Sequence, residues 1–545
     1  MGIGVILHHT FSTMSARLYS IYIFISLFVI TTSCKKKDTA DLDAKAPIEY
    51  AKKAPNTFDA LAVDSTSLEG ESANLLFNLY KKNNFQTIWN STTQRQSILN
   101  TIASSTSEGL DPQDYNLKNL SEKEGKIASA SNQDRIEYDI ELSAAAQKLL
   151  SHLSNGKLNP KKIYSDWEIK RNKYDINSHL FNAIKNDSIL ETIASAAPQH
   201  QVYKSLQNAL KIIETFPDDK FSKIGSDHKI QLNDSLKDML TIKKKLIYWK
   251  DLQSSAKLTT VYDTLTFKAV KRFQTRHGLS ADGVIGKGTI AALNETKTDR
   301  RNQIVANMER WKWFSRSLGN YYIIINIADY KMRLVKDNDT IETKRIAVGT
   351  IKRKTPILTS KISDIVINPT WTVPPTILKE DLVPSARNNR DYFRRTNISI
   401  FDWSNNPISP QDWNPDNYTK YRYVQGPGDN NSLGNVKFNF PNSHMVYLHD
   451  TNHKNIFTRN NRSLSSGCVR VEDPLPLAEM LLNNSRWSLD SIKSTISKLE
   501  TTSVKMKDAV YIYQYYWTAW SENGQLIFRD DIYNLDKDLS KKLGY

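Results

Sequence analysis

The spacing of apolar residues changes along the chain, from a helical period before about residue 301 to a strand period after it. Upstream, apolar side chains recur every three or four residues, as in Leu142, Ala145, Ala146, Leu149 and Leu153. Downstream, the apolar run from Tyr321 to Ile327 and the alternation at 331–334 predict strands, and Asp337-Asn338-Asp339 predict the turn that follows them. Helices and sheets bury their apolar faces in different layers. We therefore predict a multidomain α+β protein with a helical N-terminal part and a β-rich C-terminal part.

Length and composition limit the classes of protein to which the chain can belong. At roughly 150 residues per domain, 545 residues predict three or four domains, and the 39% hydrophobic content is enough to build their cores. Two cysteines exclude a disulfide-stapled scaffold. The formal net charge of +16 is spread along the chain without a nucleic-acid-binding signature, so we expect solvated basic surface and no nucleic-acid partner.

The N-terminus has the pattern of an export signal. The apolar stretch from Leu18 to Ile30 follows Arg17 and is shorter than the about 20 residues that a membrane-spanning helix needs. Small residues just before Cys34 resemble the bacterial lipoprotein processing site. We predict a lipoprotein signal peptide at 1–34, with Cys34 as the lipid site, and a periplasmic protein anchored to the inner or outer membrane. A plain signal peptide cleaved nearby is the alternative.

The next segments predict a tether and a helical scaffold. Residues 35–65 are polar with little apolar periodicity, which is typical of a flexible tether. Residues 66–235 have a helical period, which recurs at Tyr203, Leu206, Leu210 and Ile213. They contain no catalytic constellation, so we interpret them as a helical scaffold domain.

A small helical unit is predicted at 236–300. Leu265, Ala269, Val270 and Phe273 would share one helical face, and Gly278 and Asp282-Gly283 supply turns. The sequences FKAVKRFQTRHGL (267–279) and DGVIG (282–286), followed by Thr289, resemble the three-helix peptidoglycan-binding module of bacterial wall enzymes. The alternative is a small helical bundle with no ligand.

The β-rich part spans 301–504. Between its strand signals, residues 375–435 form a long irregular stretch with many aromatic residues and arginines, which predicts a lid or binding insertion. Residues 505–545 contain two strand-like runs around Asn523-Gly524, a hairpin signal that we expect to complete the packing of this domain.

Two short segments carry the candidate chemistry, MVYLHD (445–450) and SSGCVRV (465–471). Strand alternation places Tyr447 and His449 on one face of the first segment, and Cys468 and Arg470 on one face of the second. If the two strands are neighbours, the His449 imidazole can reach the Cys468 thiol and take its proton. Gly467 would let the backbone approach closely, with amides nearby that can donate to an oxyanion.

Other interpretations of these residues remain open. A lone cysteine is often a small buried hydrophobe, and a lone histidine is often structural. His444, His449, Asp450 and His453 could instead ligate zinc, although the odd separation of His444 and His449 points them to opposite faces of a strand.

A family resemblance covers both segments. His449 and the Ser-Ser-Gly-Cys-Val-Arg string resemble the signature of the L,D-transpeptidase catalytic domain, which presents a cysteine nucleophile on a β-rich scaffold. The similarity extends to NMERW (307–311), Asn326, Val348-Gly349, Thr355-Pro356, NPTWTVP (368–374) and QGPG (425–428). The domain order resembles the large periplasmic enzymes of Gram-negative bacteria. Many relatives have histidine where this chain has Ser466.

The resemblance implies an enzyme that makes 3-3 cross-links in peptidoglycan. Cys468 would attack a tetrapeptide stem, expel D-alanine and pass the acyl group to an acceptor amine, with His449 as the base. Gly467, Tyr447 and Ser466 would support the site. Arg470 and Trp371 would contact substrate, and pairing of Arg470 with Glu472 or Asp473 is the alternative.

The resemblance also implies acylation by carbapenems and no need for a metal or organic cofactor. An L,D-carboxypeptidase or endopeptidase on the same fold, or a non-enzymatic lipoprotein that anchors the wall, are the alternatives.

Overall fold

The computed structural model describes residues 56–68, 73–225 and 227–545. The predicted signal peptide, Cys34 and most of the predicted tether lie outside the described residues. No helix within the described ranges combines the length and the apolar character needed to cross a membrane.

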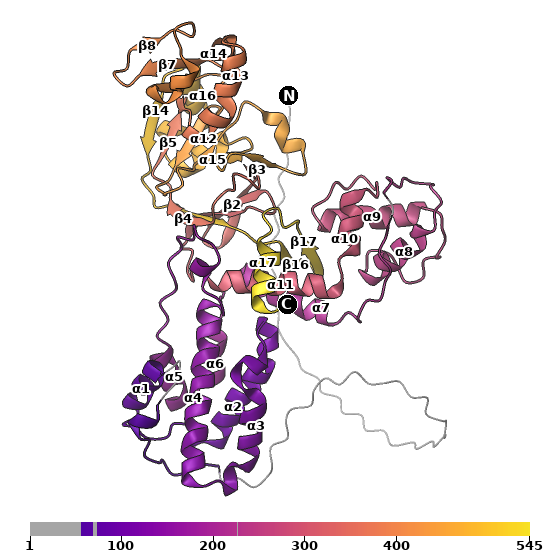
Figure 1. Ribbon diagram of the computed structural model, residues 1–545, viewed down its shortest axis with the longest axis vertical. Coiled ribbons are helices and arrows are strands. Elements are labelled where there is room, and N and C mark those ends of the chain that lie inside the picture. The colour runs from indigo at the N-terminus through magenta and orange to yellow at the C-terminus, as the bar shows by residue number, and fades with distance from the viewer. Residues whose placement is uncertain (1–55, 69–72, 226) are drawn as a thin grey trace, which may run out of the picture. The chain divides into compact units, whose positions relative to one another are not determined.

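Helices build the N-terminal part as far as residue 214 (Figure 1, indigo to purple). They are α1 (Ala73–Lys82), α2 (Thr92–Ala103), α3 (Leu117–Lys126), α4 (Asn132–Asn155), α5 (Ile176–Lys185), α6 (Ile189–Ala196) and α7 (Gln201–Glu214), joined by short 3-10 turns. The predicted apolar faces of α4 and α7 are buried, which confirms the helical periodicity. The helical prediction for this part of the fold is therefore correct.

Local signals set the ends of α4. Ser131 and Asp134 form a capping box at its start, and Gly156 ends it with a φ of +79°. A Cβ at Gly156 would lie 2.4 Å from Nε1 of Trp313, so only glycine fits between α4 and the segment after α11 (Lys297–Lys312).

Three helices form the next unit, α8 (Asp238–Tyr248), α9 (Thr264–Arg276) and α10 (Lys287–Asn294). On α9, Ala269, Val270 and Phe273 are buried as predicted, whereas the Leu265 side chain is 48% exposed. Leu265 lies in the first turn of α9, where the neighbouring Thr266 is the buried residue. His277 caps the end of α9 and stacks on Phe273.

The C-terminal part is built on an 11-stranded mixed sheet in the order β14-β5-β10-β11-β13-β3-β2-β1-β15-β4, with β12 paired to β3. Its strands are β1 (Tyr321–Asn326), β2 (Lys331–Lys336), β3 (Asp339–Gly349), β4 (Leu358–Lys361), β5 (Asp364–Ile367), β10 (Val436–Asn439), β11 (Leu448–His449), β12 (Ser463–Ser465), β13 (Val469–Val471), β14 (Thr502–Lys505) and β15 (Tyr511–Tyr515). Helices α15 (Leu475–Leu482) and α16 (Leu489–Ser497) belong to the same part of the chain. The predicted turn between β2 and β3 is present, with positive φ at Asp337 and Asn338.

The insertion within this part is folded, and not irregular as the sequence suggested. It contains α12 (Pro375–Ile377), the π-helix η6 (Leu378–Leu382), α13 (Val383–Asn388), α14 (Asp391–Arg395), β7 (Ile398–Asp402), β8 (Pro407–Ile408) and β9 (Tyr421–Gln425). Together with β6 (Trp371–Thr372) its strands form a separate four-stranded sheet. Phe393, Trp413 and Tyr423 lie in a hydrophobic core of the insertion's own. Short elements of two to six residues have too little periodicity for the sequence to reveal them.

The chain ends in β16 (Ala519–Glu522), β17 (Gln525–Phe528) and α17 (Leu535–Leu543). The hairpin turn lies at Asn523-Gly524, both with positive φ, as predicted. β16 and β17 form a two-stranded sheet of their own, and Asn208 of α7 donates to Ser521 Oγ at 2.9 Å. The hairpin therefore packs against the helical part, while β15 is the C-terminal strand that joins the large sheet.

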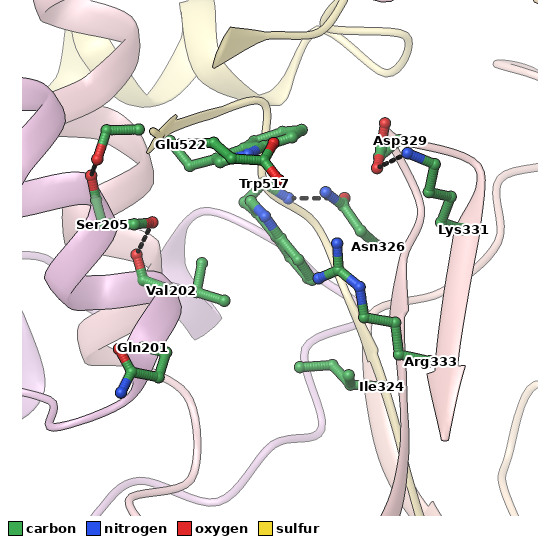
Figure 2. A pocket seen from close by; sticks show the side chains of 12 residues that line it. Gln201, Val202, Ser205, Ile324, Asn326, Asp329, Lys331, Arg333, Trp517 and Glu522 are labelled. Carbon is green, nitrogen blue, oxygen red and sulfur yellow. Dashed lines mark hydrogen bonds and ion pairs between the residues drawn. The ribbon is translucent and has the colours of Figure 1, made fainter. Parts of the chain in front are cut away.

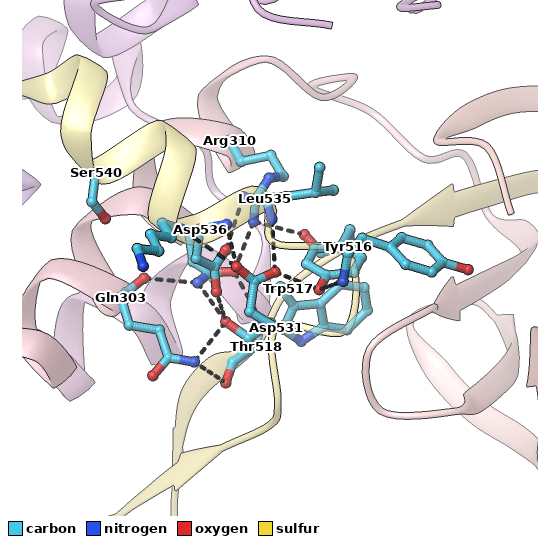
Figure 3. Close-up of polar contacts among 12 residues, drawn as sticks. Gln303, Arg310, Tyr516, Trp517, Thr518, Asp531, Leu535, Asp536 and Ser540 are labelled. Atoms are coloured by element: carbon cyan, nitrogen blue, oxygen red, sulfur yellow. Dashed lines mark hydrogen bonds and ion pairs between the residues drawn. The ribbon is translucent and has the colours of Figure 1, made fainter. Parts of the chain in front are cut away.

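A network of buried hydrogen bonds and one ion pair connects α11 to the C-terminal segment at residues 516–536 (Figure 3). Arg310 is fully buried, and its Nη2 lies 2.8 Å from Oδ1 of Asp536. Thr518 donates to the same carboxylate and accepts a hydrogen bond from the Asn307 amide at 2.9 Å. The 307–311 segment is thus part of the structural framework that joins the helical and β-rich parts.

Candidate active site

The candidate residues lie on two adjacent, parallel strands in the middle of the large sheet. Leu448 of β11 is paired with Val469 of β13, and His449 with Arg470. The predicted neighbourhood of the two segments is therefore present. Val446, Leu448, Val469 and Val471 all point into the core. The strand in the segment 445–450 is short, since β11 covers only Leu448 and His449. At the start of this segment, Met445 has a positive φ and is 75% exposed.

The register places Tyr447, and not His449, next to Cys468. The Val469 amide donates a hydrogen bond to the Tyr447 carbonyl at 3.1 Å. Tyr447, the residue before β11, therefore lies beside Cys468, the residue before β13. Both the backbone amide and the side chain of Tyr447 hydrogen-bond the Cys468 thiol. His449 lies two residues after Tyr447, opposite Arg470 in the register, and the centroids of the His449 and Tyr447 rings are 5.6 Å apart.

Opposing effects act on the Cys468 thiol. Burial raises its pKa, while the hydrogen bonds from Tyr447 and the positive charges of Lys437 and Arg470 act in the opposite direction. Because burial is the largest effect, the net pKa is raised. The resting side chain is therefore a protonated thiol at neutral pH.

His449 is a neutral imidazole in this environment. The side chain is buried, and burial together with the charge of Arg470 lowers the pKa of His449 to about 3. Its Nδ1 has no hydrogen-bond partner among the described residues. A neutral ring is the form of histidine that can accept a proton.

Arg470 is half-buried and faces the thiol without a carboxylate partner. Glu472 is bound by Arg345, with Nε at 2.7 Å, and Asp473 lies 3.7 Å from Lys344. Neither acid therefore pairs with Arg470, and its Nε has no partner among the described residues. The positive charge of Arg470 instead favours the thiolate form of Cys468.

The turn before Cys468 is held by several hydrogen bonds. Gly467 has a φ of +112°, which favours glycine, and its carbonyl accepts from Oγ1 of Thr355 at 2.8 Å. The Gly467 amide donates to Oγ of Ser465 at 3.2 Å, and that hydroxyl donates to the Cys468 carbonyl at 2.6 Å. Ser466 is exposed, and its Oγ accepts a hydrogen bond from Arg353 at 2.8 Å.

Trp371 and Lys437 complete the surroundings of Tyr447. Trp371 of β6 hydrogen-bonds the Tyr447 side chain, which links the insertion's sheet to the site. Lys437 of β10 is paired with His449, and its Nζ lies 4.0 Å from the centre of the Tyr447 ring. Burial lowers the pKa of Lys437. Sequence reasoning missed this residue, although its position between the buried Val436 and Phe438 is a strand alternation that predicts a shared face with His449.

The residues considered as zinc ligands are held apart by other contacts. The Asp450 carboxylate accepts a hydrogen bond from the Asn435 amide at 3.0 Å and pairs with Lys454. His444 lies 3.8 Å from Glu168. In the described ranges, no three histidine, cysteine or acidic side chains are grouped as metal ligands would be.

Fold and site together define a multidomain α+β protein whose β-rich domain presents one thiol among two cations, a tyrosine and a buried histidine. Three family models match the chain. Residues 320–512 match the L,D-transpeptidase catalytic domain (YkuD), residues 235–293 match the "Putative peptidoglycan binding domain" and residues 74–210 match the Scaffold domain. The chain thus carries a scaffold domain, a domain of the peptidoglycan-binding family and a YkuD-type L,D-transpeptidase catalytic domain.

A curated relative covers part of the chain. A protein of Haemophilus influenzae named "Putative L,D-transpeptidase" is 40% identical over 221 residues, which are 40% of this chain and 45% of that protein. The chain therefore spans less than half the length of this relative.

Solved structures are more distant. An L,D-transpeptidase from Mycobacterium smegmatis is 11% identical, with a TM-score of 0.19, over 36% of this chain and 58% of that one. An L,D-transpeptidase from Stackebrandtia nassauensis is 12% identical, with a TM-score of 0.20, over 55% of this chain and 97% of that one.

Proposed function

We propose that this protein is a peptidoglycan L,D-transpeptidase that forms 3-3 cross-links through a thioester on Cys468. The observation that supports this most is the arrangement of Cys468 beside Tyr447, Arg470 and Lys437 on the catalytic-domain sheet, with neutral His449 on the adjacent strand. The domain of the peptidoglycan-binding family in the same chain favours a cell-wall substrate.

The first half-reaction forms the acyl-enzyme. The Cys468 sulfur would attack the carbonyl carbon of the third residue in a tetrapeptide stem. Because burial keeps the resting thiol protonated, its proton has to leave as the sulfur–carbon bond forms, and His449 would accept it. The peptide bond to the terminal D-alanine would break, and the leaving amine would take up this proton.

The second half-reaction transfers the acyl group. An amine of a second stem would attack the thioester, the carbon–sulfur bond would break, and a new amide would form as the thiol is regenerated. His449 would take the proton of the attacking amine. Water in place of the amine would give carboxypeptidase activity, and attack on a β-lactam ring would give the acyl-enzyme expected with carbapenems.

Neighbouring groups would position the substrate and stabilise the oxyanion. The Gly467 amide already donates to Ser465, so the Cys468 amide is our proposed oxyanion donor. The Tyr447 hydroxyl would join it once the sulfur has bonded to the substrate carbon and no longer accepts from Tyr447. Arg470, which lacks an acidic partner among the described residues, would bind a substrate carboxylate. Trp371 would contact the stem from the insertion's side, and Ser466 would support the turn.

The product masses test the reaction. The full chain is incubated with disaccharide tetrapeptides, and the products are weighed by mass spectrometry. We expect dimers that lack one D-alanine, and no dimers with Cys468→Ala. Trimmed monomers alone would indicate the hydrolase, and unchanged substrate would indicate a wall-anchoring protein.

We also propose that the protein is exported to the periplasm and held at a membrane by a lipid on Cys34, which lies outside the described residues. After expression in a Gram-negative host, we expect the chain in the membrane fraction and Cys34→Ala in the soluble periplasmic fraction. Recovery of both proteins in the same fraction would contradict the anchor.

A further inference from the structure

A cavity of about 200 Å³ lies away from Cys468, where α7, one face of β1 and β2, and the segment at 517–522 meet (Figure 2). None of its lining residues belongs to the candidate active site. Its volume is below the roughly 300 to 1,000 Å³ of pockets for drug-sized ligands, so it suits one amino acid or the end of a short peptide.

Asn326 lines this cavity and has a buried amide donor. The side chain is 4% exposed, and its Oδ1 accepts from the amides of Ala328 at 3.2 Å and Trp517 at 3.4 Å. These two donors fix the orientation of the amide, because only the oxygen can accept. The Nδ2 group is therefore directed away from them, and it has no hydrogen-bond partner in the part of the chain that the structure describes.

Arg333 brings a cation to the same place. Figure 2 shows its guanidinium beside the Trp517 ring, below the Asn326 amide. No acid pairs with Arg333 among the described residues, although two acids line the cavity. Asp329 is bound by Arg529 at 2.5 Å and Lys331 at 3.4 Å, and Glu522 is exposed to solvent.

We propose that this cavity binds a carboxylate-bearing amino acid or peptide end. Asn326 Nδ2 has no acceptor and Arg333 has no acidic partner among the described residues, so both groups can donate to an oxygen anion that enters the cavity. The Trp517 ring beside them forms an apolar wall for the rest of the residue. Lys331, which pairs with Asp329, lies on the same face of the sheet.

The test measures binding with the catalytic thiol blocked. Cys468 in the full chain is alkylated with iodoacetamide, and binding is followed by calorimetry. The probes are a disaccharide tetrapeptide, the same compound with its carboxylates amidated, and free D-alanine. The choice of peptidoglycan probes rests on the proposed function, but the alkylated protein needs no enzymatic activity, so the two proposals fail independently.

We expect the tetrapeptide or D-alanine to bind, and whichever binds more tightly identifies the source of the carboxylate. Arg333→Gln should weaken binding about tenfold or more, because it removes a charged hydrogen-bond donor. Asn326→Asp keeps the oxygen that accepts from Ala328 and Trp517 but replaces the donor, and should weaken binding at least as much. Arg345→Gln, an exposed change of equal charge on β3, should bind as the parent does.

Three results would overturn the proposal. They are unchanged affinity in Arg333→Gln, equal affinity for the amidated tetrapeptide, and no binding of either carboxylate probe at millimolar concentration.

Discussion

Arg353 Nη1 donates a hydrogen bond to Ser466 Oγ at 2.8 Å, two residues before the proposed nucleophile. The same guanidinium pairs with Asp381 at 2.9 Å and with Glu380, both in the π-helix of the insertion. Arg353 therefore connects the turn that carries Cys468 to the insertion that borders the site.

We predict that Arg353→Ala loosens the insertion and slows acylation of Cys468. The ion pairs are partly exposed, so their contribution to global stability is about 1 kcal/mol or less. Hydrogen exchange of residues 375–388 should become several-fold faster, and the acylation rate with a carbapenem should fall. Arg387→Ala, which removes an exposed pair with Asp416 inside the insertion, is the matched control and should change neither.

We predict that Tyr447→Phe makes the Cys468 thiol less acidic. The side chain of Tyr447 hydrogen-bonds the sulfur and lowers its pKa, so its removal should raise that pKa further. Alkylation of Cys468 by iodoacetamide, followed by peptide mapping over a range of pH, measures the midpoint. Tyr511→Phe, at an exposed position on β15, should leave the midpoint in place. An equal midpoint in all three proteins would remove Tyr447 from the site chemistry.

We predict that acid destabilises the fold below about pH 6.5 through its buried histidines. Burial lowers the pKa of His449 to about 3 and of His152 to about 4, and it also lowers the pKa of His200 and His277. Between these values and 6.5 the unfolded chain binds more protons than the folded one, so the free energy of unfolding falls as the pH drops. Urea unfolding at pH 7, 6, 5 and 4 measures this.

His152 allows the histidine effect to be isolated from that of the carboxylates. Its Nδ1 lies 2.9 Å from the Tyr115 hydroxyl in a partly buried contact. His152→Gln should show a smaller loss of stability between pH 6.5 and 4 than the parent. In His179→Gln, at an exposed position of α5, the free energy of unfolding should change with pH as it does in the parent. The same dependence on pH in the parent and in His152→Gln would contradict the prediction.

We predict that the Arg310–Asp536 pair is costly to break from one side. Arg310→Met would leave a buried carboxylate without its cation, which typically costs about 3–5 kcal/mol. Urea denaturation should show this loss, and the Arg310→Met, Asp536→Leu double variant should recover part of it. Arg301→Met removes the more exposed pair with Glu214 and should cost about 1 kcal/mol or less. Equal losses for the two arginine variants would show that burial of the first pair is not decisive.

Local sequence signals were enough to predict the buried faces, the turns and the two polar strand faces. The apolar spacing of α4 and α7, the positive-φ turns at Asp337-Asn338 and Asn523-Gly524, and the alternation around His449 and Cys468 all appear in the structure. These features depend on backbone geometry within a few residues, so periodicity and turn residues report them directly.

The tertiary structure alone decided which elements became neighbours. Periodicity shows which side of a strand is buried, but it does not show the partner strand or the register, because these depend on packing between distant segments. Only the fold placed Tyr447 beside Cys468, Lys437 opposite His449 and β15 between β1 and β4. In the same way, the cavity at Asn326 and Arg333 exists because α7, β1–β2 and the C-terminal segment meet there.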